Sequence, residues 1–172
     1  MSIKGNNPRL CRSFFERDVL TVAPELLGKI LVCRVGEEYT RFRVTETEAY
    51  RGENDLACHS SKGRTARTEV MYHTGGSLYV YLIYGMYWML NIVTGQENEP
   101  QAVLIRGLEG IYGPGRLTKK LLIDKTFYGE DVTISSRIWV EDDGFVPSIQ
   151  IGKRIGVDYA VIWKEKLWRF FY

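Results

Sequence analysis

The sequence predicts an α+β fold, in which one antiparallel β-sheet is accompanied by a few peripheral helices. Two observations lead to this prediction. Most apolar segments are short, rich in β-branched and aromatic residues, and joined by tight turns, and only a few segments carry a helical pattern. The 172 residues fit one domain, and no repeat or linker divides them. We therefore expect a single domain over residues 1–172, with residues 1–12 as a polar arm that can be flexible.

The first part of the chain is predicted to hold one short helix and two strands. Thr21 can cap a helix over residues 22–29, in which Pro24 is tolerated in the first turn and Gly28 ends the helix. Two strands joined by a tight turn follow, and then a loop-rich stretch with one short helix. The strands cover residues 29–35 and 39–50. The loop-rich stretch covers residues 51–76, and the short helix lies within it at residues 67–72.

The second part of the chain is predicted to be rich in strands. A hairpin turns at Tyr84, Gly85 and Met86, because strand-like runs flank these residues on both sides. The predicted strands cover residues 77–83, 87–94, 101–108, 137–142 and 166–172, and a helix covers residues 115–124.

Composition excludes several classes of protein. Hydrophobic residues make up 45% of the chain and charged residues 26%, as in ordinary globular proteins. The net charge is only +2, so a polyanionic partner must be met by local clusters of cations. The cysteines Cys11, Cys33 and Cys58 form no C-x-x-C pair, which argues against a disulfide framework or a cysteine zinc site and favours a reducing compartment. No apolar stretch has the length of a signal peptide or a membrane span, so we expect no membrane association.

The strand over residues 39–50 carries the first candidate for catalysis. Alternation places Glu46, Glu48 and Tyr50 on one face. Glutamates on a strand usually mark a solvated face. A buried strand with an aromatic neighbour can instead raise the pKa of a carboxyl enough for general-base catalysis. Periodicity does not choose between Glu46 and Glu48.

The loop that follows is rich in cations. His59 precedes Lys62, Arg64 and Arg67, a grouping that suits contacts with phosphate and is equally consistent with a solvated surface loop. His59 and His73 have no acidic ligands at metal-binding spacing, so we predict no metal site.

Aromatic residues concentrate in the predicted hairpin. Tyr79 and Tyr81 share one face of its first strand, where burial in the core is the default interpretation. Tyr84 lies at the turn, which is hard to bury and is well placed to wedge between stacked bases. Asn91 and Arg106 interrupt apolar strands, so each belongs either to a structural network or to a ligand site.

Four motifs occur in order: TETEAY, ACHSSKGRT, LYVYLIYGMYWMLNIVTG and AVLIRGLE. With these motifs the chain resembles the alkyladenine (3-methyladenine) DNA glycosylase family, repair enzymes that excise alkylated purines. The resemblance runs from RSFFERD to LWRFF, most of the chain. It implies a curved, open-barrel-like antiparallel sheet of the kind found in the C-terminal domain of formyltransferases. It also implies a monofunctional DNA glycosylase of base excision repair.

The resemblance assigns roles to individual residues. Glu48 is implied to be the general base that activates water, and Tyr50, His59 and Tyr81 to stack the extruded base, with the His59 backbone reading its edge. Asn91 is implied to discourage normal guanine by a clash with its amino group. The remaining assignments are Arg106 as a catalytic residue that holds phosphate near the lesion, Tyr84 and Met86 as intercalating residues, and Lys62, Arg64 and Arg67 as DNA-backbone contacts.

The resemblance also implies the partner and the reaction. We expect the partner to be double-stranded DNA containing damaged purines, with 3-methyladenine, 7-methylguanine, etheno-adenine and hypoxanthine as the range of lesions. Nucleotide flipping brings the base to the enzyme, and hydrolysis leaves an abasic site without strand cleavage, because no lysine nucleophile is implied. We expect a monomer that needs no cofactor, in the cytoplasm or nucleoid of a bacterium or the nucleus of a eukaryote.

Two departures from the family pattern and two alternative functions remain. The connection at residues 111–115 is shorter than the family's helical segment, and Ala66 and Thr68 replace a proline and an asparagine in its T-P-R-N motif. A non-catalytic binder of damaged DNA would use the same aromatic residues and cations without needing Glu48. A small-molecule enzyme, such as a formyltransferase, can share the fold, because a fold does not determine function.

Overall fold

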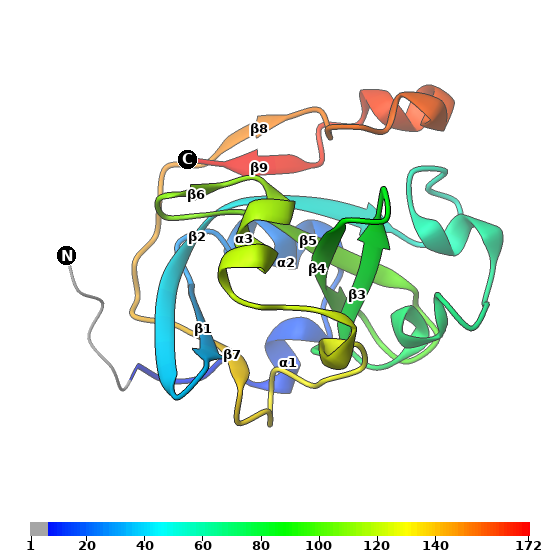
Figure 1. Ribbon diagram of the computed structural model, residues 1–172. Coiled ribbons are helices and arrows are strands. Elements are labelled where there is room, and N and C mark those ends of the chain that lie inside the picture. The colour runs from blue at the N-terminus through cyan, green and yellow to red at the C-terminus, as the bar shows by residue number, and fades with distance from the viewer. Residues whose placement is uncertain (1–6) are drawn as a thin grey trace.

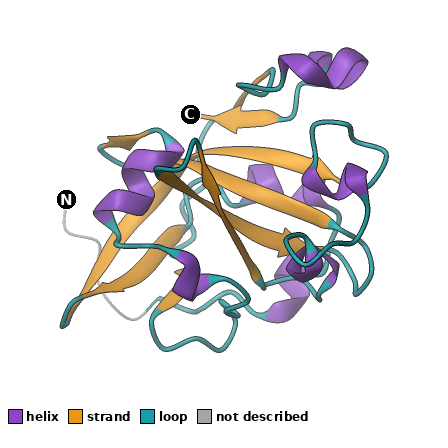
Figure 2. Cartoon of the chain, turned by 45° about the vertical axis from the view of Figure 1, so that its right-hand side comes forward, coloured by secondary structure: helices purple, strands orange, loops and turns teal. Residues whose placement is uncertain are grey.

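One antiparallel β-sheet organises residues 7–172, the part of the chain that the computed structural model describes (Figure 1). Its main path runs in the order β3-β4-β5-β2-β1-β7, while β6 pairs with β5, and β9 pairs with both β2 and β8. The sheet curls into a half-barrel, which confirms the predicted α+β class (Figure 2). The strands are β1 (Ile30–Val35), β2 (Glu38–Arg51), β3 (Leu78–Ile83), β4 (Tyr87–Thr94), β5 (Gln101–Leu108), β6 (Ile111–Tyr112), β7 (Ile138–Glu141), β8 (Gln150–Gly152) and β9 (Arg169–Phe171).

The long strand β2 joins the two halves of the sheet. Its first half, from Glu38 to Arg43, pairs with β1, and its second half, from Val44 to Arg51, pairs with β5. The register between β2 and β5 shifts on both sides of Glu46, which marks a β-bulge. A bulge bends its strand and increases the local twist. The bend therefore lets a single strand serve both halves of the curled sheet.

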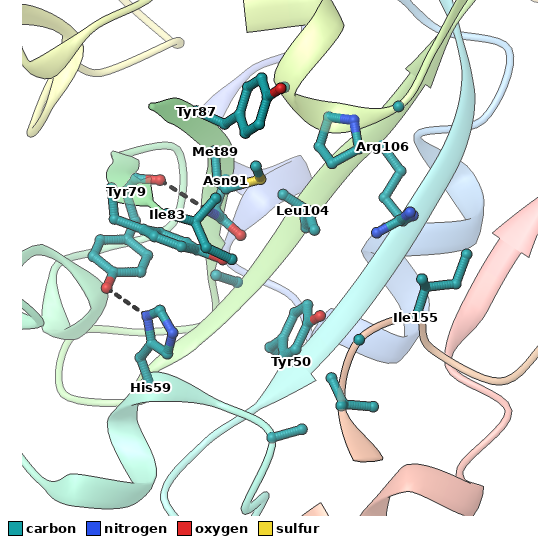
Figure 3. Close-up of a pocket in the computed structure, with 18 of the residues that line it drawn as sticks. Tyr50, His59, Tyr79, Ile83, Tyr87, Met89, Asn91, Leu104, Arg106 and Ile155 are labelled. Atoms are coloured by element: carbon teal, nitrogen blue, oxygen red, sulfur yellow. Dashed lines mark hydrogen bonds between the residues drawn. The ribbon is translucent and has the colours of Figure 1, made fainter. Parts of the chain in front are cut away.

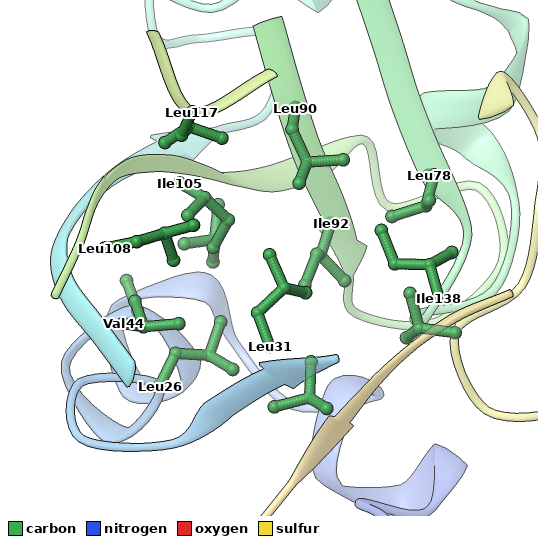
Figure 4. Close-up of a cluster of buried hydrophobic side chains, with 14 of the residues drawn as sticks. Leu26, Leu31, Val44, Leu78, Leu90, Ile92, Ile105, Leu108, Leu117 and Ile138 are labelled. Atoms are coloured by element: carbon green, nitrogen blue, oxygen red, sulfur yellow. The ribbon is translucent and has the colours of Figure 1, made fainter. Parts of the chain in front are cut away.

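The apolar core lies between the concave face of the sheet and the helices α1 (Arg12–Phe15), α2 (Val19–Glu25) and α3 (Pro114–Lys120) (Figure 4). Alternation along the strands directs one set of side chains inward, including Leu31, Leu90 and Ile105, and each of these is at most 1% exposed. Full burial of such a side chain contributes roughly 1.5–3 kcal/mol. The core therefore holds the curvature of the sheet from inside.

Helix α2 differs from the helix predicted over residues 22–29. It begins at Val19, and Asp18 rather than Thr21 caps it, because the Asp18 side chain accepts a hydrogen bond from the Leu20 backbone N–H at 2.9 Å. An aspartate at this position satisfies one of the free N–H groups of the first turn. Pro24 consequently lies near the end of the helix, not in its first turn.

The shorter elements agree in part with the sequence patterns. The 3-10 helix η2 (Glu69–Tyr72) falls within the helix predicted over residues 67–72. The 3-10 helices η1 (His59–Lys62), η3 (Lys125–Phe127) and η4 (Asp158–Glu165) were not predicted, nor were strands β6 and β8. Strands of two or three residues carry too little alternation to be recognised, and only their pairing with a neighbour identifies them.

The flexible arm expected over residues 1–12 falls partly outside the described residues, because residues 1–6 are not among them. The described part lies against strand β7. Arg9 forms a β-bridge with Glu141, and the Leu10 backbone N–H donates to the Val140 backbone oxygen at 2.8 Å. No helix within residues 7–172 is long and apolar enough to cross a membrane.

The C-terminal segment, with β8, η4 and β9, lies at one end of the sheet (Figure 1). Inside η4 the chain kinks at Val161, whose φ of 51° and ψ of −118° lie in a region that favours glycine. A β-branched side chain in this region carries conformational strain.

We expect Val161→Gly to stabilise the protein, because glycine adopts the positive φ without strain. The expected gain is about 1 kcal/mol, which corresponds to a rise in melting temperature of about 2–4 °C for a chain of this length. Val161 is 63% exposed, so the substitution removes little packing.

The matched control is Val146→Gly, at a residue that is 79% exposed and does not have a positive φ. Glycine there only increases the entropy of the unfolded chain, so the melting temperature should fall or stay unchanged. A Val161→Gly variant that melts no higher than the parent protein would contradict the assignment of strain.

Candidate functional site

A cavity of about 720 Å³ opens where strands β2 to β5 meet the segment 155–159 (Figure 3). Its volume and its mainly apolar, aromatic lining are those of a small-molecule site. Several elements distant in the sequence contribute to it. The lining includes Tyr50 from β2, His59 from η1, Tyr79 and Tyr81 from β3, Asn91 from β4, Arg106 from β5, and Ile155.

Glu48 is completely buried directly behind this lining. Its Oε2 accepts a hydrogen bond from the Tyr50 hydroxyl at 2.8 Å, and its Oε1 accepts one from the Ile155 backbone N–H at 2.7 Å. Arg106 Nε lies 3.6 Å from Oε1. Burial raises the pKa of the Glu48 carboxyl above its ordinary value, and Arg106 and the two hydrogen bonds oppose that rise. An oriented carboxylate with a raised pKa is suited to general-base catalysis.

Glu46 lies beside Glu48 in a different electrostatic environment. Its Oε1 accepts hydrogen bonds from Arg106 Nε at 3.2 Å and from Arg169 Nη1 at 3.3 Å. Two guanidinium groups therefore offset its charge, and its side chain is 22% exposed whereas that of Glu48 is fully buried. Of the two carboxyl groups that the sequence left open, Glu48 is the fully buried one, and it alone accepts hydrogen bonds from the Tyr50 hydroxyl and the Ile155 N–H.

The β-bulge at Glu46 brings β5 close to the two carboxylates. Gly107 faces the bulge, and a Cβ atom there would lie 2.9 Å from Thr45 Oγ1 and 3.1 Å from Glu46 Cβ. Only glycine permits this approach. The neighbouring Arg106 can therefore contact both Glu46 and Glu48.

His59 and two tyrosines form one wall of the cavity. The rings of His59 and Tyr81 meet edge to face with centroids 4.5 Å apart, and His59 Nδ1 and the Tyr79 hydroxyl are hydrogen-bonded at 2.8 Å. Burial, together with the nearby charges of Arg67 and Lys62, lowers the pKa of His59 to about 4. The imidazole is therefore neutral at physiological pH, and the rings of this wall carry no charge of their own.

Asn91 places an amide on the floor of the cavity (Figure 3). The residue is 3% exposed, and its Nδ2 donates a hydrogen bond to the Tyr79 backbone oxygen at 3.0 Å. That bond fixes the amide plane relative to β3. Asn91 therefore belongs to a structural network and also lines the cavity.

The turn between β3 and β4 carries Tyr84 at the cavity and Met86 next to it. Tyr84 and Gly85 have φ values of 53° and 65°, and the Met86 backbone N–H closes the turn onto the Ile83 oxygen at 3.1 Å. Positive φ at both central residues is the geometry of tight hairpin turns. Because the strands do not cover this turn, Tyr84 is 84% exposed and Met86 is 64% exposed.

The three cations predicted in the loop after His59 differ in their surroundings. The Arg67 guanidinium lies 5.3 Å from the centroid of the Tyr81 ring, at the aromatic wall. Arg64 forms a bidentate ion pair with Glu69, with distances of 2.7 and 2.9 Å, so its charge is largely offset. Lys62 is exposed, and no salt bridge involves it within residues 7–172.

Several residues of the cavity carried no signal in the sequence. Ile155 contributes a backbone N–H to Glu48, and a backbone donor has no residue-type signature. Tyr79 was interpreted as core, but its hydroxyl bonds His59 at the cavity. Tyr112 and Arg116, which flank the short connection to α3, are exposed and line the opposite rim.

The described residues hold no evident metal centre. Within residues 7–172 no group of three or more His, Cys, Asp or Glu side chains is arranged to hold a metal ion. Cys33 and Cys58 are buried and unpaired, and burial raises the pKa of each thiol to about 11.

Comparison with known proteins gives consistent matches. The sequence profile of the family described as Methylpurine-DNA glycosylase (MPG) matches residues 13–112 and 109–172, two parts that overlap beside the short connection 111–115. Relatives include proteins from Psychrobacter cryohalolentis (45% identical, covering 92% of this chain and 89% of that protein), Legionella pneumophila strain Lens (47%, 95% and 93%) and Methanocella arvoryzae (44%, 95% and 92%). Each bears the name "Putative 3-methyladenine DNA glycosylase".

We expect Glu48→Gln to raise the melting temperature at neutral pH. Burial raises the folded-state pKa of Glu48, so ionisation of this group costs stability once the pH rises through that pKa. Glutamine resembles the protonated form and avoids this cost, and its oxygen and amide can still engage the Ile155 N–H and the Tyr50 hydroxyl.

The gain should be largest at neutral pH and should disappear as the pH falls through the folded pKa towards the ordinary value for glutamate, because the parent protein then carries a protonated Glu48. Thermal denaturation of both proteins across that range tests the sign. A variant that is less stable at neutral pH would mean that the bonds to the carboxylate outweigh its burial.

Proposed function

Because the chain belongs to the methylpurine-DNA glycosylase family, we propose that its cavity receives a damaged purine turned out of double-stranded DNA and that Glu48 activates the water that releases it. The enzyme class is that of the family, a DNA-3-methyladenine glycosylase acting in base excision repair. The observation that carries the proposal is the buried and oriented Glu48 carboxylate behind an aromatic cavity.

The proposed reaction is a hydrolysis. The ionised Glu48 accepts a proton from water, the water oxygen bonds to the C1′ atom of the sugar, and the N-glycosidic bond breaks with its electron pair going to the base. An alkylated purine that is positively charged leaves as a neutral molecule. No lysine is among the described residues that line the cavity, which supports release of the base without strand cleavage.

Aromatic walls suit the proposed recognition of alkylated purines. Tyr50, Tyr81 and the neutral His59 offer electron-rich faces that attract a cationic base. A protonated imidazole would repel such a base, so the low pKa of His59 supports its assignment to the wall. The fixed Asn91 amide can clash with the amino group of guanine, which supports discrimination against the normal base.

The lesions proposed for this cavity are 3-methyladenine, 7-methylguanine, etheno-adenine and hypoxanthine. The cavity volume of about 720 Å³ admits a purine together with its sugar. Arg106 contacts the two carboxylates through Nε, which leaves its terminal nitrogens to meet the phosphate of the extruded nucleotide. One copy of the chain supplies all of these residues, which supports action as a monomer.

Extrusion of the nucleotide requires a substitute for the lost stacking. Tyr84 is proposed to enter the duplex at the vacated position with Met86 beside it, because both are exposed on the β3–β4 turn, where Tyr84 lines the cavity. Unstacking costs a few kcal/mol, which aromatic stacking offsets. Lys62 and Arg67 on one side and Arg116 on the other are proposed to contact the DNA backbone, with a smaller contribution from the ion-paired Arg64.

Glu48→Gln should abolish most base release. The test is single-turnover excision from duplexes that contain one etheno-adenine or hypoxanthine, with 7-methylguanine DNA as a less demanding substrate. General-base catalysis contributes roughly 10²- to 10⁴-fold, so the rate should fall by that factor while binding of lesion DNA persists. The rate of the parent enzyme should fall as the pH drops through the raised pKa of Glu48.

Glu46→Gln is the matched control, and its rate should fall less, because Glu46 contacts Arg106 but neither the Tyr50 hydroxyl nor the Ile155 N–H, the two donors that orient Glu48. Full excision by Glu48→Gln together with a large loss in Glu46→Gln would transfer the role of base to Glu46. Tight lesion binding by the parent protein with no release from any duplex would indicate a non-catalytic binder.

Tyr84→Ser should slow excision from duplex DNA and leave excision from single-stranded DNA unchanged. Stacking of a base on an aromatic ring is worth about 1–3 kcal/mol, so the expected loss on duplex is roughly 5- to 150-fold. Tyr39→Ser is the control at an exposed tyrosine that does not line the cavity. Equal rates for Tyr84→Ser and the parent enzyme on duplex would remove the wedge from the proposal.

A further inference from the structure

A buried ion pair joins the loop after β2 to the C-terminal segment. Arg154 Nη1 lies 2.5 Å from Asp55 Oδ2, and Nη2 lies 2.9 Å from Asp55 Oδ1, so the pair is bidentate. Both side chains are fully buried. Ninety-nine residues separate the partners in the sequence. Neither residue lines the cavity, and the reaction proposed above uses neither of them.

The pair fixes three segments of backbone at once. Arg154 Nη1 donates to the Ala49 oxygen at 2.9 Å, and Nη2 donates to the Trp163 oxygen at 3.1 Å. Asp55 accepts hydrogen bonds from the backbone N–H groups of Arg51 and Ala57, each at 3.1 Å. The strand that carries Glu48, the loop before His59 and the η4 segment therefore share one charged centre.

The Arg154–Asp55 pair lies next to the two groups that donate hydrogen bonds to the Glu48 carboxylate, the Ile155 N–H and the Tyr50 hydroxyl. Ile155, whose N–H donates to Glu48 Oε1, follows Arg154 directly in the chain. The Arg154 guanidinium also lies 4.9 Å from the ring centroid of Tyr50, whose hydroxyl donates to Oε2. Both hydrogen bonds to the carboxylate thus depend on where Arg154 lies.

The Ile155 side chain does little to anchor its own backbone, although Val157 is buried two residues further on. The side chain of Ile155 is 49% exposed, so packing contributes little to its position. Gly156, which follows, has a φ of 76° and lacks a side chain that could be packed. A buried ion pair often stabilises a protein no more than apolar residues of the same shape would. We therefore expect the Arg154–Asp55 pair to contribute more to the position of the Ile155 backbone than to the free energy of unfolding.

We propose that Asp55 and Arg154 are a positioning pair for the base, which holds the Ile155 N–H and the Tyr50 hydroxyl on the Glu48 carboxylate and so directs the carboxylate towards water. The inference rests on the proposed function in that Glu48 is the base. It adds two residues that touch neither the substrate nor the reacting atoms.

Several other groups act on Glu48 and must be separated from the pair. Arg106 and Glu46 are its nearest charged neighbours, Arg169 contacts Glu46, and Tyr81 faces it from β3. The Ile155 and Tyr50 hydrogen bonds both lower the pKa of Glu48. Loss of either bond should raise that pKa further, so the acid limb of the pH–rate profile reports on positioning.

The test compares Arg154→Lys and Asp55→Asn with the parent enzyme in single-turnover excision across pH. Positioning predicts that both variants move the acid limb upward by about one pH unit, so that the rate below the limb falls about tenfold. Both variants should also lower the plateau rate, while affinity for lesion-containing duplex stays unchanged. Arg154→Ala would remove the positive charge and the hydrogen bonds together, so it would not distinguish an electrostatic effect from a positioning effect.

The two variants distinguish positioning from a purely electrostatic effect, because the two explanations predict different shifts of the acid limb. Arg154→Lys keeps the positive charge, so charge alone predicts no shift of the limb. Asp55→Asn removes a negative charge near Glu48 and leaves Arg154 unpaired, so charge alone predicts a shift to lower pH. An unchanged limb in Arg154→Lys, or a downward shift in Asp55→Asn, would overturn the inference. If Arg154→Lys does not fold, Asp55→Asn carries the test, because it preserves the shape of the side chain.

Arg137→Lys provides the matched control, because Arg137 also forms a partly buried pair with a carboxylate, Glu130, and does not line the cavity. It should lower the melting temperature without moving the acid limb. A carbon-13 NMR titration of the Glu48 carboxyl, assigned with Glu48→Gln, measures the same shift without turnover. Failure of the parent enzyme to excise would refute the proposed function, whereas this titration would still decide the positioning inference.

Discussion

The burial of one carboxylate governs the organisation of this protein. A charged group removed from water must be paired or hydrogen-bonded, or it loses its charge. Glu48 meets this requirement with Tyr50 from its own strand, Arg106 from β5 and a backbone donor at Ile155. The curled sheet, the β-bulge and the return of the C-terminal segment along β2 bring these groups together.

The partners of Glu48 also limit how far its pKa can rise. Burial alone would favour the neutral form, and a protonated Glu48 could not accept a proton from water. The hydrogen bonds and Arg106 oppose that effect, while Glu46 adds to it. Arg106 thus serves two carboxylates of unequal burial, and Glu46, held by Arg169 as well, keeps Arg106 in place. The site balances desolvation, which makes a stronger base, against ion pairing, which keeps the base ionised.

Sequence patterns predicted the longer strands but not the contacts between segments that are distant in the sequence. Alternation in residues 45–50 correctly placed Glu46, Glu48 and Tyr50 on one face, because side-chain direction in a strand follows the period of two. The predicted helix cap was wrong. Thr21 and Asp18 can both cap a helix, and the helix begins after Asp18 because Val19 is buried in the core as its first residue. The residues of the proposed site came from the resemblance to the methylpurine-DNA glycosylase family. The ion pair between Asp55 and Arg154 and the pairing of Arg64 with Glu69 left no signal, because such contacts depend on tertiary distance.

The arrangement of the C-terminal segment has a consequence for how the protein is made. Residues 150–171 follow every other part of the site in the chain, yet they supply the Ile155 donor and the strand β9 that pairs with Glu46 to Glu48. During synthesis the parts of the cavity that come from β2 to β5 therefore emerge before the carboxylate has a complete set of partners, and segment 155–159 of the lining comes last. A chain interrupted before this segment would keep the residues proposed to recognise damaged DNA without an oriented base, and it could occupy lesions without removing them. The last residues to be made are therefore the ones that complete the partners of Glu48.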